Sequence, residues 1–170
     1  MFARKFLKGH PKEGQPTYFV EKIWQALYKN GLSYGNELLT SELEIFSNPS
    51  HYIHPKHHTI RAGKHFKEGD YFSPRVWSNR PYSSKQLSIA PDLLLHKVFD
   101  IEILVDDDYI CIMIDDFPFY EENKEFVTQL DALKTLALND GLQLQDFRDW
   151  FKWGKPFSGQ ILCWSKGIVY

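Results

Sequence analysis

Five histidines within fifteen residues form the first group of side chains in this sequence that could do chemistry. Neutral imidazole is the commonest metal ligand in proteins, so their density invites a metal-binding hypothesis. They contain no HExxH-type pair, however, and no carboxylate or cysteine lies among them. Consecutive side chains on a strand point to opposite faces, so two adjacent histidines could not both hold one ion. The sequence therefore favours surface and groove-lining roles, without a native metal site, for His51, His54, His57, His58 and His65.

The segment 56–61, with the sequence KHHTIR, is the second such group. On a strand, Thr59 and Arg61 would lie on one face while Ile60 points the other way, into a core. Lys56, at the strand entry, reaches the side of Thr59 only through a turn or bulge. Polar groups in the mouth of a barrel are costly unless a polar or anionic ligand binds there. The alternative is a solvated edge strand with ordinary basic residues, and the chemistry alone favours that alternative.

Basic and aromatic side chains are interleaved in a third segment, between residues 75 and 86. Basic groups pair with phosphates, and each flat ring can stack on a base with about 1–3 kcal/mol. This combination suits single-stranded or flipped nucleotides better than duplexes. The alternative is a β-hairpin whose rings pack on the barrel while its charges stay in water. The residues concerned are Arg75, Trp77, Arg80, Tyr82 and Lys85.

Turn residues divide the chain into the elements that must position these groups. Apolar residues at helical spacing predict a helix that Thr17 caps and Gly31 ends. Short runs rich in β-branched and aromatic residues predict strands, and two further helices follow them. The strand-like runs fall within 57–115 and at 159–165, and the later helices at 126–137 and 147–151. The pattern predicts one α+β domain over 1–170, a mixed, mainly antiparallel barrel flanked by about three helices, with an insertion at 30–55.

Composition and charge exclude several classes of protein. Of 170 residues, 43% are hydrophobic and 25% charged, which is typical of a globular domain and excludes a disordered one. The net charge is only -2, yet residues 1–90 hold 13 Lys and Arg against 7 Asp and Glu, and residues 91–170 hold 7 against 15. This asymmetry suits a basic binding face backed by an acidic body, or two solvated faces. It is too weak for a duplex-DNA binder held by many phosphates.

Several features bear on the location of the protein and on cofactors. The longest apolar stretches are far shorter than the roughly 20 residues of a membrane span, and the first residues lack the apolar core of a secretory signal. Cys111 and Cys163 lie in apolar runs, which favours buried free thiols in a reducing compartment. The aspartates at 106–108 and 115–116 are explained by turns rather than by a cation site. We therefore predict a cytoplasmic protein that has no cofactor and no contact with a membrane.

The K-x-x-T-I-R motif at 56–61, followed by Phe66 and by Gly-Asp at 69–70, resembles the ASCH family, a branch of the PUA-like β-barrel superfamily. The Asn-Asp-Gly turn at 139–141, between two helices, is similar to a second family segment. The block at 77–86 is extra and looks like one in bacterial and phage-encoded members. The resemblance covers roughly residues 1–29 and 56–165.

The resemblance implies a cleft between sheet and helices that takes RNA or nucleotides. It also implies hydrolysis, because one small member removes an acyl group from a modified cytidine nucleoside and others cleave RNA. Carried onto this chain, the catalytic residues fall on Lys56, Thr59 and Asp140, and the family arginine on Arg61. A desolvated lysine can act as base, a threonine as nucleophile and a carboxyl group as acid. Asp140 is one methylene shorter than the family's glutamate, so the match supports a ligand cleft more than the same reaction.

Two functions stay open as predictions. The first is an RNA- or nucleotide-binding domain, whose affinity would fall steeply with salt. Its ligand-binding residues would be Arg61, Lys64, Arg75, Trp77, Arg80, Tyr82 and Lys85. The second is a small amidohydrolase acting on a modified nucleoside or RNA through Lys56, Thr59 and Asp140, with an enclosed pocket and little salt dependence. A protein-interaction role for the 30–55 segment is a third option.

Overall fold

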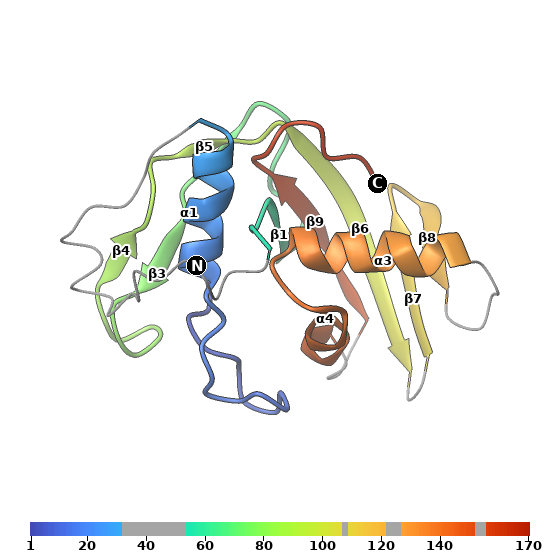
Figure 1. Cartoon of the computed structure of the whole chain (residues 1–170), viewed down its shortest axis with the longest axis horizontal. Coiled ribbons are helices and arrows are strands. Elements are labelled where there is room, and N and C mark those ends of the chain that lie inside the picture. Colours follow the sequence, from blue (N-terminus) through green and yellow to red (C-terminus); the bar gives the residue numbers. More distant parts are fainter. Residues whose placement is uncertain (32–53, 107–108, 122–126, 152–155) are drawn as a thin grey trace. The chain divides into compact units, whose positions relative to one another are not determined.

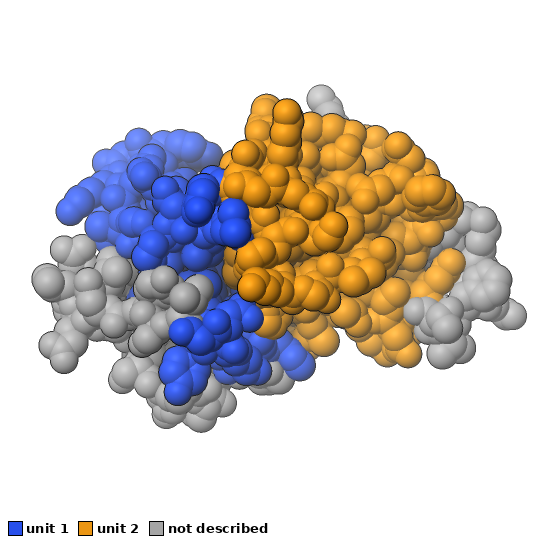
Figure 2. Space-filling model, turned by 90° about the horizontal axis from the view of Figure 1, so that it is seen from above, with its two compact units in different colours: residues 1–56, 71–94 blue, residues 57–70, 95–170 orange. Residues whose placement is uncertain are grey.

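The computed structural model describes residues 1–31, 54–106, 109–121, 127–151 and 156–170 (Figure 1). Within these residues the chain forms three helices and nine strands, and every strand pairing is antiparallel. The chain divides into two compact units, each built from two stretches of sequence (Figure 2). The first unit comprises residues 1–56 and 71–94, and the second comprises residues 57–70 and 95–170. Most of the predicted insertion at 30–55 lies outside the described residues.

Helix α1 (Phe19–Lys29) belongs to the first unit. Its apolar residues recur at helical spacing and form one buried stripe. The buried residues are Phe19, Val20, Ile23, Ala26 and Leu27. The predicted Thr17 cap is displaced by one residue, because Tyr18 occupies the cap position in the left-handed region at φ 57°. The Thr17 hydroxyl nevertheless accepts a hydrogen bond from Phe19 N at 3.4 Å.

Two antiparallel strand pairs complete the first unit. The pairs are β2 (Tyr71–Phe72) with β5 (Leu93–Leu94), and β3 (Arg75–Trp77) with β4 (Gln86–Ser88). In the β3–β4 hairpin, Val76 and Leu87 lie opposite each other and are buried. Arg75 and Ser88, the neighbouring pair, are exposed. The hairpin therefore has one apolar face and one polar face, as alternation along a strand requires.

An open five-stranded sheet forms the centre of the second unit, in the order β1-β9-β6-β7-β8. Its strands are β1 (His58–Ala62), β6 (Lys97–Asp106), β7 (Tyr109–Ile114), β8 (Phe117–Glu121) and β9 (Phe157–Cys163). Strand β9 lies between β1 and β6, so that Ile161 pairs with both Ile60 and Phe99. One face of the sheet is buried and carries Ile101, Ile103, Ile112, Ile114 and Ile161.

Two helices, α3 (Val127–Asn139) and α4 (Leu144–Phe151), pack in the second unit. In Figure 1, α3 crosses the sheet, and Leu136 and Phe147 of these helices are fully buried. Gly141 follows α3 in the left-handed region at φ 75°, where glycine commonly ends a helix, and its N–H donates to Leu138 O at 2.8 Å. The predicted break between two helices at 139–141 is confirmed.

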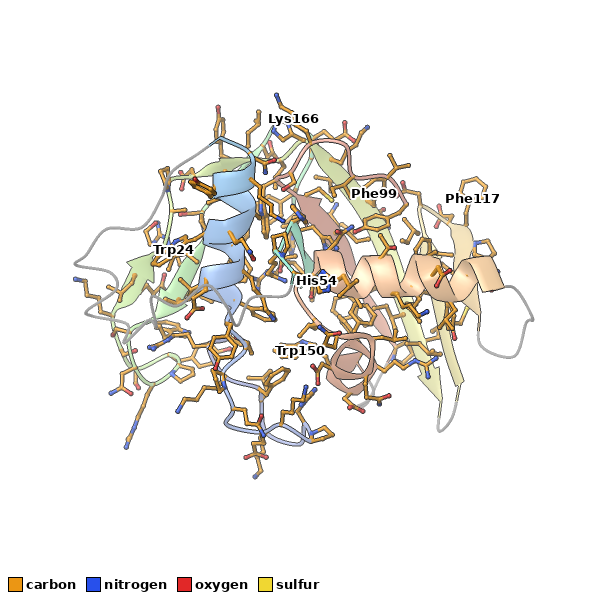
Figure 3. All side chains as sticks on the ribbon, viewed as in Figure 1. Trp24, His54, Phe99, Phe117, Trp150 and Lys166 are labelled. Atoms are coloured by element: carbon orange, nitrogen blue, oxygen red, sulfur yellow. The ribbon has the colours of Figure 1, made fainter. Side chains whose placement is uncertain are left out.

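Two prolines change the strand pattern from the expected one. Pro74 lacks an N–H and separates β2 from β3, so this part of the strand-like region forms two short strands. Strand β8 contains Phe117 and Pro118 and lies outside the runs predicted within 57–115 and at 159–165. A proline is tolerated there because β8 lies at the edge of the sheet, beside a register shift in β7. In Figure 3, the Phe117 side chain at the start of β8 points away from the ribbon, and it is 74% exposed.

The α+β class and the mainly antiparallel pairing are confirmed for the described residues. Among those residues no closed barrel forms, because no pairing joins the edge strands β1 and β8. None of the helices in this part of the chain has the length and apolar character needed to cross a membrane.

Candidate functional site

The first candidate site lies on the β3–β4 hairpin, within the first unit. We call it the hairpin surface, and it consists of Arg75, Trp77, Arg80, Tyr82 and Lys85. Its three basic side chains are exposed, and Tyr82 is 92% exposed. The ring of Tyr82 lies against that of the half-buried Trp77, with 5.7 Å between centroids and an angle of 51°. The structure thus brings the two rings together and places three cations on the same hairpin.

The turn that carries Arg80 and Tyr82 is held by its own hydrogen bonds. The Ser84 hydroxyl donates to Arg80 O at 2.8 Å and accepts from Asn79 N at 3.0 Å. Tyr82 adopts φ 62°, in the left-handed region, which costs a residue other than glycine on the order of 1 kcal/mol. The turn therefore keeps a largely exposed aromatic ring in water on a strained backbone, with the contact to Trp77 as a favourable interaction of that ring.

Lys56 lies in the first unit and is 1% exposed. Its Nζ lies 4.4 Å from the ring centroid of Phe19 and 5.8 Å from that of Phe2. Its backbone N–H donates to Lys22 O of α1 at 3.0 Å. A cation over aromatic faces gains about 2 kcal/mol when it is desolvated, which offsets part of the cost of burying the amine. Lys56 is therefore a buried amine rather than a solvated surface lysine.

The second candidate site is a buried polar group in the second unit. We call it the Asp140 cluster, and it consists of His58, Asn139, Asp140 and Tyr170. His58 comes from β1 and is fully buried, and Asp140, from the α3–α4 turn, is 7% exposed. The Asn139 amide donates to the Tyr170 hydroxyl at 3.0 Å, and the Tyr170 ring packs edge-on against the His58 ring at 5.6 Å. Asp140 is thus part of a buried network, not of a solvated turn.

The geometry around His58 indicates where a proton sits. Its Nε2 lies 3.2 Å from Leu136 O, and because a carbonyl oxygen can only accept, this hydrogen bond assigns a proton to Nε2. Its Nδ1 faces Asp140 Oδ1 at 3.8 Å. The Asp140 cluster therefore places a ring nitrogen and a carboxylate oxygen close together at a buried position.

Burial raises the pKa of two groups in or beside the Asp140 cluster. The pKa of the Tyr170 hydroxyl is well above its usual range, mainly because the group is desolvated, and the negative charge of Asp140 adds to this. The pKa of Cys163, which pairs with His58 across β1 and β9, rises to about 12 for the same reasons. Both groups therefore stay protonated and neutral near pH 7, and neither supplies a nucleophilic anion.

Thr59 and Arg61 lie on the face of β1 opposite to His58, as strand alternation predicts. Thr59 is buried, and Arg61 is half-buried. Desolvation lowers the pKa of the Arg61 guanidinium, while the negative charge of Asp140 opposes this shift. The structure therefore links Asp140 to His58 and, electrostatically, to Arg61. A contact between Asp140 and Thr59 stays a prediction, and so does their convergence with Lys56, which belongs to the other unit.

Lys64, predicted to bind a ligand, is engaged with carboxylates. Its Nζ lies 2.6 Å from Asp100 Oδ2. This hydrogen bond raises the pKa of Lys64, and the charges of Asp100, Asp116 and Glu102 contribute to the same shift. The side chain is about half exposed, so a phosphate could reach it only in competition with Asp100.

Gln160 on β9 is a buried polar residue that the sequence analysis did not single out. Its amide oxygen accepts from His65 N at 2.9 Å and from Phe66 N at 3.0 Å, and its amide nitrogen donates to Asp100 Oδ1 at 3.3 Å. These bonds attach the segment after β1 to the sheet. A lone amide in a mostly apolar strand was the available signal, because such a group needs partners when it is buried.

The histidines do not gather into a metal site in the part of the chain that the structure describes, where no group of three or more His, Cys, Asp or Glu side chains could hold an ion. His57 Nδ1 lies 2.8 Å from the Ser165 hydroxyl, and His58 belongs to the Asp140 cluster. His65 is exposed, and His51 lies outside the described residues. The described histidines near β1 thus serve different local contacts.

Comparison of the chain with protein-family models, curated proteins and solved structures gives no match. The hairpin surface and the Asp140 cluster are therefore the features from which a function can be inferred.

Proposed function

We propose that this chain is a PUA-like protein of the ASCH type and that its first unit binds single-stranded RNA through the hairpin surface. The proposal depends on the Tyr82 side chain, which is 92% exposed and lies against the ring of Trp77. The hairpin that holds both rings also carries three exposed cations. A base stacked on an exposed ring and phosphates paired with neighbouring cations are the two contacts that single-strand binders combine.

The charge of the first unit supports an anionic ligand. The unit holds 10 Lys and Arg against 6 Asp and Glu, a net charge of +4, in a chain whose net charge is -2. Each phosphate that a single strand brings to a cation lowers the slope of log affinity against log salt by about 0.7. Arg75, Arg80 and Lys85 together therefore account for a slope of about -2.

A single strand fits this surface better than a duplex does. In a duplex the bases stack on each other, so an exposed ring reaches them only by unstacking a pair, at a cost of a few kcal/mol. In a single strand the bases are already separable, and Tyr82 can stack on one of them. The proposal therefore includes a preference for single strands over duplexes of equal length.

Fluorescence anisotropy with a labelled 12-nucleotide oligouridine, titrated from 50 to 200 mM salt, tests the proposal. We expect binding that weakens with salt, a loss of about tenfold for Tyr82→Ala, and less loss for Tyr82→Phe, which keeps the ring. Arg80→Gln with Lys85→Gln should flatten the salt slope by about 1.4. Lys166→Gln, an exposed lysine of the second unit, is the control and should change nothing. Equal binding of a 12-base-pair duplex, or no effect of Tyr82→Ala, would contradict the proposal.

A second candidate function is hydrolysis of an acylated nucleoside, and the burial of the polar side chains of Lys56, Thr59 and Asp140 favours it. In this reaction, as the family resemblance implies, Lys56 would take the proton of the Thr59 hydroxyl, and the Thr59 oxygen would add to the acyl carbon. The carbon–nitrogen bond would then break, and the leaving amine would take a proton from the Asp140 carboxyl group. Water would next hydrolyse the acyl ester on Thr59, its hydroxyl going to the acyl group and its proton to Asp140, while Lys56 returns a proton to Thr59. General acid catalysis of this kind contributes about 10²–10⁴-fold in rate.

Ultraviolet absorbance of an N-acylated cytidine tests this candidate, because loss of the acyl group changes the base spectrum. Asp140→Asn and Lys56→Ala should each lower the rate at least 100-fold, and Asp140→Glu, which restores the acid of the family, should keep or raise it. Lys134→Ala is the matched control. An inactive wild-type protein would exclude this reaction and leave the RNA-binding proposal intact.

A further inference from the structure

Residues 4–12 form a second basic segment, which the sequence analysis did not assign to any function. Lys5, Lys8 and Lys12 are exposed, and Arg4 is half-buried. The nearest acid in the sequence is Glu13, whose carboxylate accepts a hydrogen bond from Gly9 N at 3.0 Å. Burial raises the pKa of the Glu21 carboxyl group overall, while the charge of Arg4 lowers it, so Arg4 also lies near a carboxylate. Lys5, Lys8 and Lys12 are thus the exposed positive charges of the segment.

Hydrogen bonds attach this chain segment to the strand that carries the hairpin surface. Phe2 N donates to Arg75 O at 2.8 Å, and the Arg4 guanidinium donates to Ser78 O at 3.2 Å. All four residues belong to the first unit. The basic segment thus begins directly beside β3, whose residues Arg75 and Trp77 are part of the hairpin surface.

The basic segment is also ordered by its own contacts. Phe6 N donates to Gln15 O at 2.9 Å, and Gly14 N donates back to Phe6 O at 3.0 Å, so the segment folds back on itself. The Phe6 ring stacks on the His10 ring at 4.4 Å, and Lys12 Nζ lies 5.8 Å from the Phe6 centroid. The lysines are therefore carried on a fixed backbone, which lowers the entropy lost when a ligand binds.

We propose that residues 4–12 and the hairpin surface form one continuous site for the backbone of a single-stranded nucleic acid. This inference depends on the proposed RNA binding and adds the length of the ligand to it. The hairpin surface stacks a base and holds the phosphates next to it, and Lys5, Lys8 and Lys12 hold phosphates farther along the strand. A short oligonucleotide reaches the hairpin alone, whereas a longer one engages both parts.

The test measures affinity and salt slope with labelled oligouridines of 4, 8 and 12 nucleotides. The test variant carries Lys5→Gln, Lys8→Gln and Lys12→Gln together. The matched control carries Lys67→Gln, Lys134→Gln and Lys166→Gln, which remove the same charge from exposed sites of the second unit. A thermal melt followed by circular dichroism checks that each variant is folded.

For the test variant we expect at least a tenfold loss of affinity for the 12-mer, a salt slope that is less steep by about 2, and little change for the 4-mer. If the test and control variants bind the 12-mer alike while Arg80→Gln with Lys85→Gln still weakens it, this inference is wrong and the hairpin proposal survives. If the wild-type protein binds none of the oligonucleotides, both fail. If polyglutamate of equal charge competes as well as RNA does, the surface binds acidic protein instead, which also overturns the inference.

Discussion

The two units of this chain differ in net charge and in where most of their candidate functional side chains lie, although Lys56 of the first unit is buried. The first unit has a net charge of +4 and exposes the cations of the hairpin surface. The second unit holds 10 Lys and Arg against 16 Asp and Glu, a net charge of -6, and buries its most reactive groups, His58, Asp140 and Cys163. An exposed charge contributes little to folding and stays available to a ligand. A buried one must be satisfied by its neighbours, so removing a partner destabilises the fold.

This contrast indicates what each kind of group can do. Substitutions on the hairpin surface should change binding without changing stability, whereas substitutions in the Asp140 cluster should change stability and any chemistry together. The first group is therefore the cleaner test of function. The second requires a measurement of folding beside every measurement of activity.

The largest expected effect comes from truncating a core residue in either unit. Ile112→Ala in β7 and Ile23→Ala in α1 each remove a fully buried side chain, and each should lower the free energy of unfolding by about 2–5 kcal/mol. Hydrogen exchange read by mass spectrometry shows where protection is lost. If the units fold separately, each variant loses protection only in its own unit. Loss across both units would support the single domain that the sequence predicts.

The next largest loss of stability is expected for Asp140→Ala, which removes the carboxylate that faces the buried His58 ring. We expect the free energy of unfolding to fall by about 2–3 kcal/mol, measured by urea denaturation. Asp131→Ala, on the exposed side of α3, is the control, since it removes only a surface ion pair with Lys134. A similarly small change in both variants would show that the contact between His58 and Asp140 contributes nothing.

A smaller effect, visible only at alkaline pH, is expected from Cys163. Its pKa in the folded protein is about 12, against an ordinary value of 9.0, so the unfolded chain releases this proton first as the pH rises. Stability should therefore fall above pH 9, by on the order of 1 kcal/mol per pH unit from this group. Between pH 8 and 10.5, the free energy of unfolding should fall less in Cys163→Ala than in the wild type. The control is Cys111→Ala, which removes a partly exposed thiol and should lose as much stability as the wild type does. Parallel losses in all three proteins would contradict this.

The smallest effect is expected for Lys64→Ala, which removes the half-exposed ion pair with Asp100. Exposed pairs contribute little to stability, and salt screens them. Denaturation in low and high salt should show a small loss of stability that shrinks as salt is added. A large loss that salt does not reduce would mean that Lys64 positions the segment after β1 together with Gln160.

Local features of the fold could be predicted from the sequence, because neighbouring residues determine them. The spacing of apolar residues in α1 and the glycine turn at 139–141 are examples. The strand at Phe117-Pro118 could not be predicted, because only its place at the edge of a sheet makes a proline acceptable. The partners of Asp140 could not be predicted either. His58 is about 80 residues away, and the two meet only because α3 packs against the start of β1.

The exposed part of the candidate site was easier to anticipate than the buried part. A hairpin places alternate residues on its polar face by geometry alone, so Arg75 and Trp77 could be assigned to one face from their spacing. Gln160 needed the structure, since its partners, His65 and Asp100, come from two other segments. The role of Lys56 also depends on rings of α1 and of the first residues, which no spacing near Lys56 reveals.

The place of β9 in the sheet has a consequence for how the chain is made. Of the described strands, β9 leaves the ribosome last, yet it lies between β1 and β6 and is paired with both. The meander β6-β7-β8 can assemble as it emerges, whereas β1 must wait for a partner about 100 residues farther along. Until then β1 and one edge of β6 present open backbone to other nascent chains. The pairing of β9 with β1 and β6 thus ends the period in which these open edges can pair with another chain.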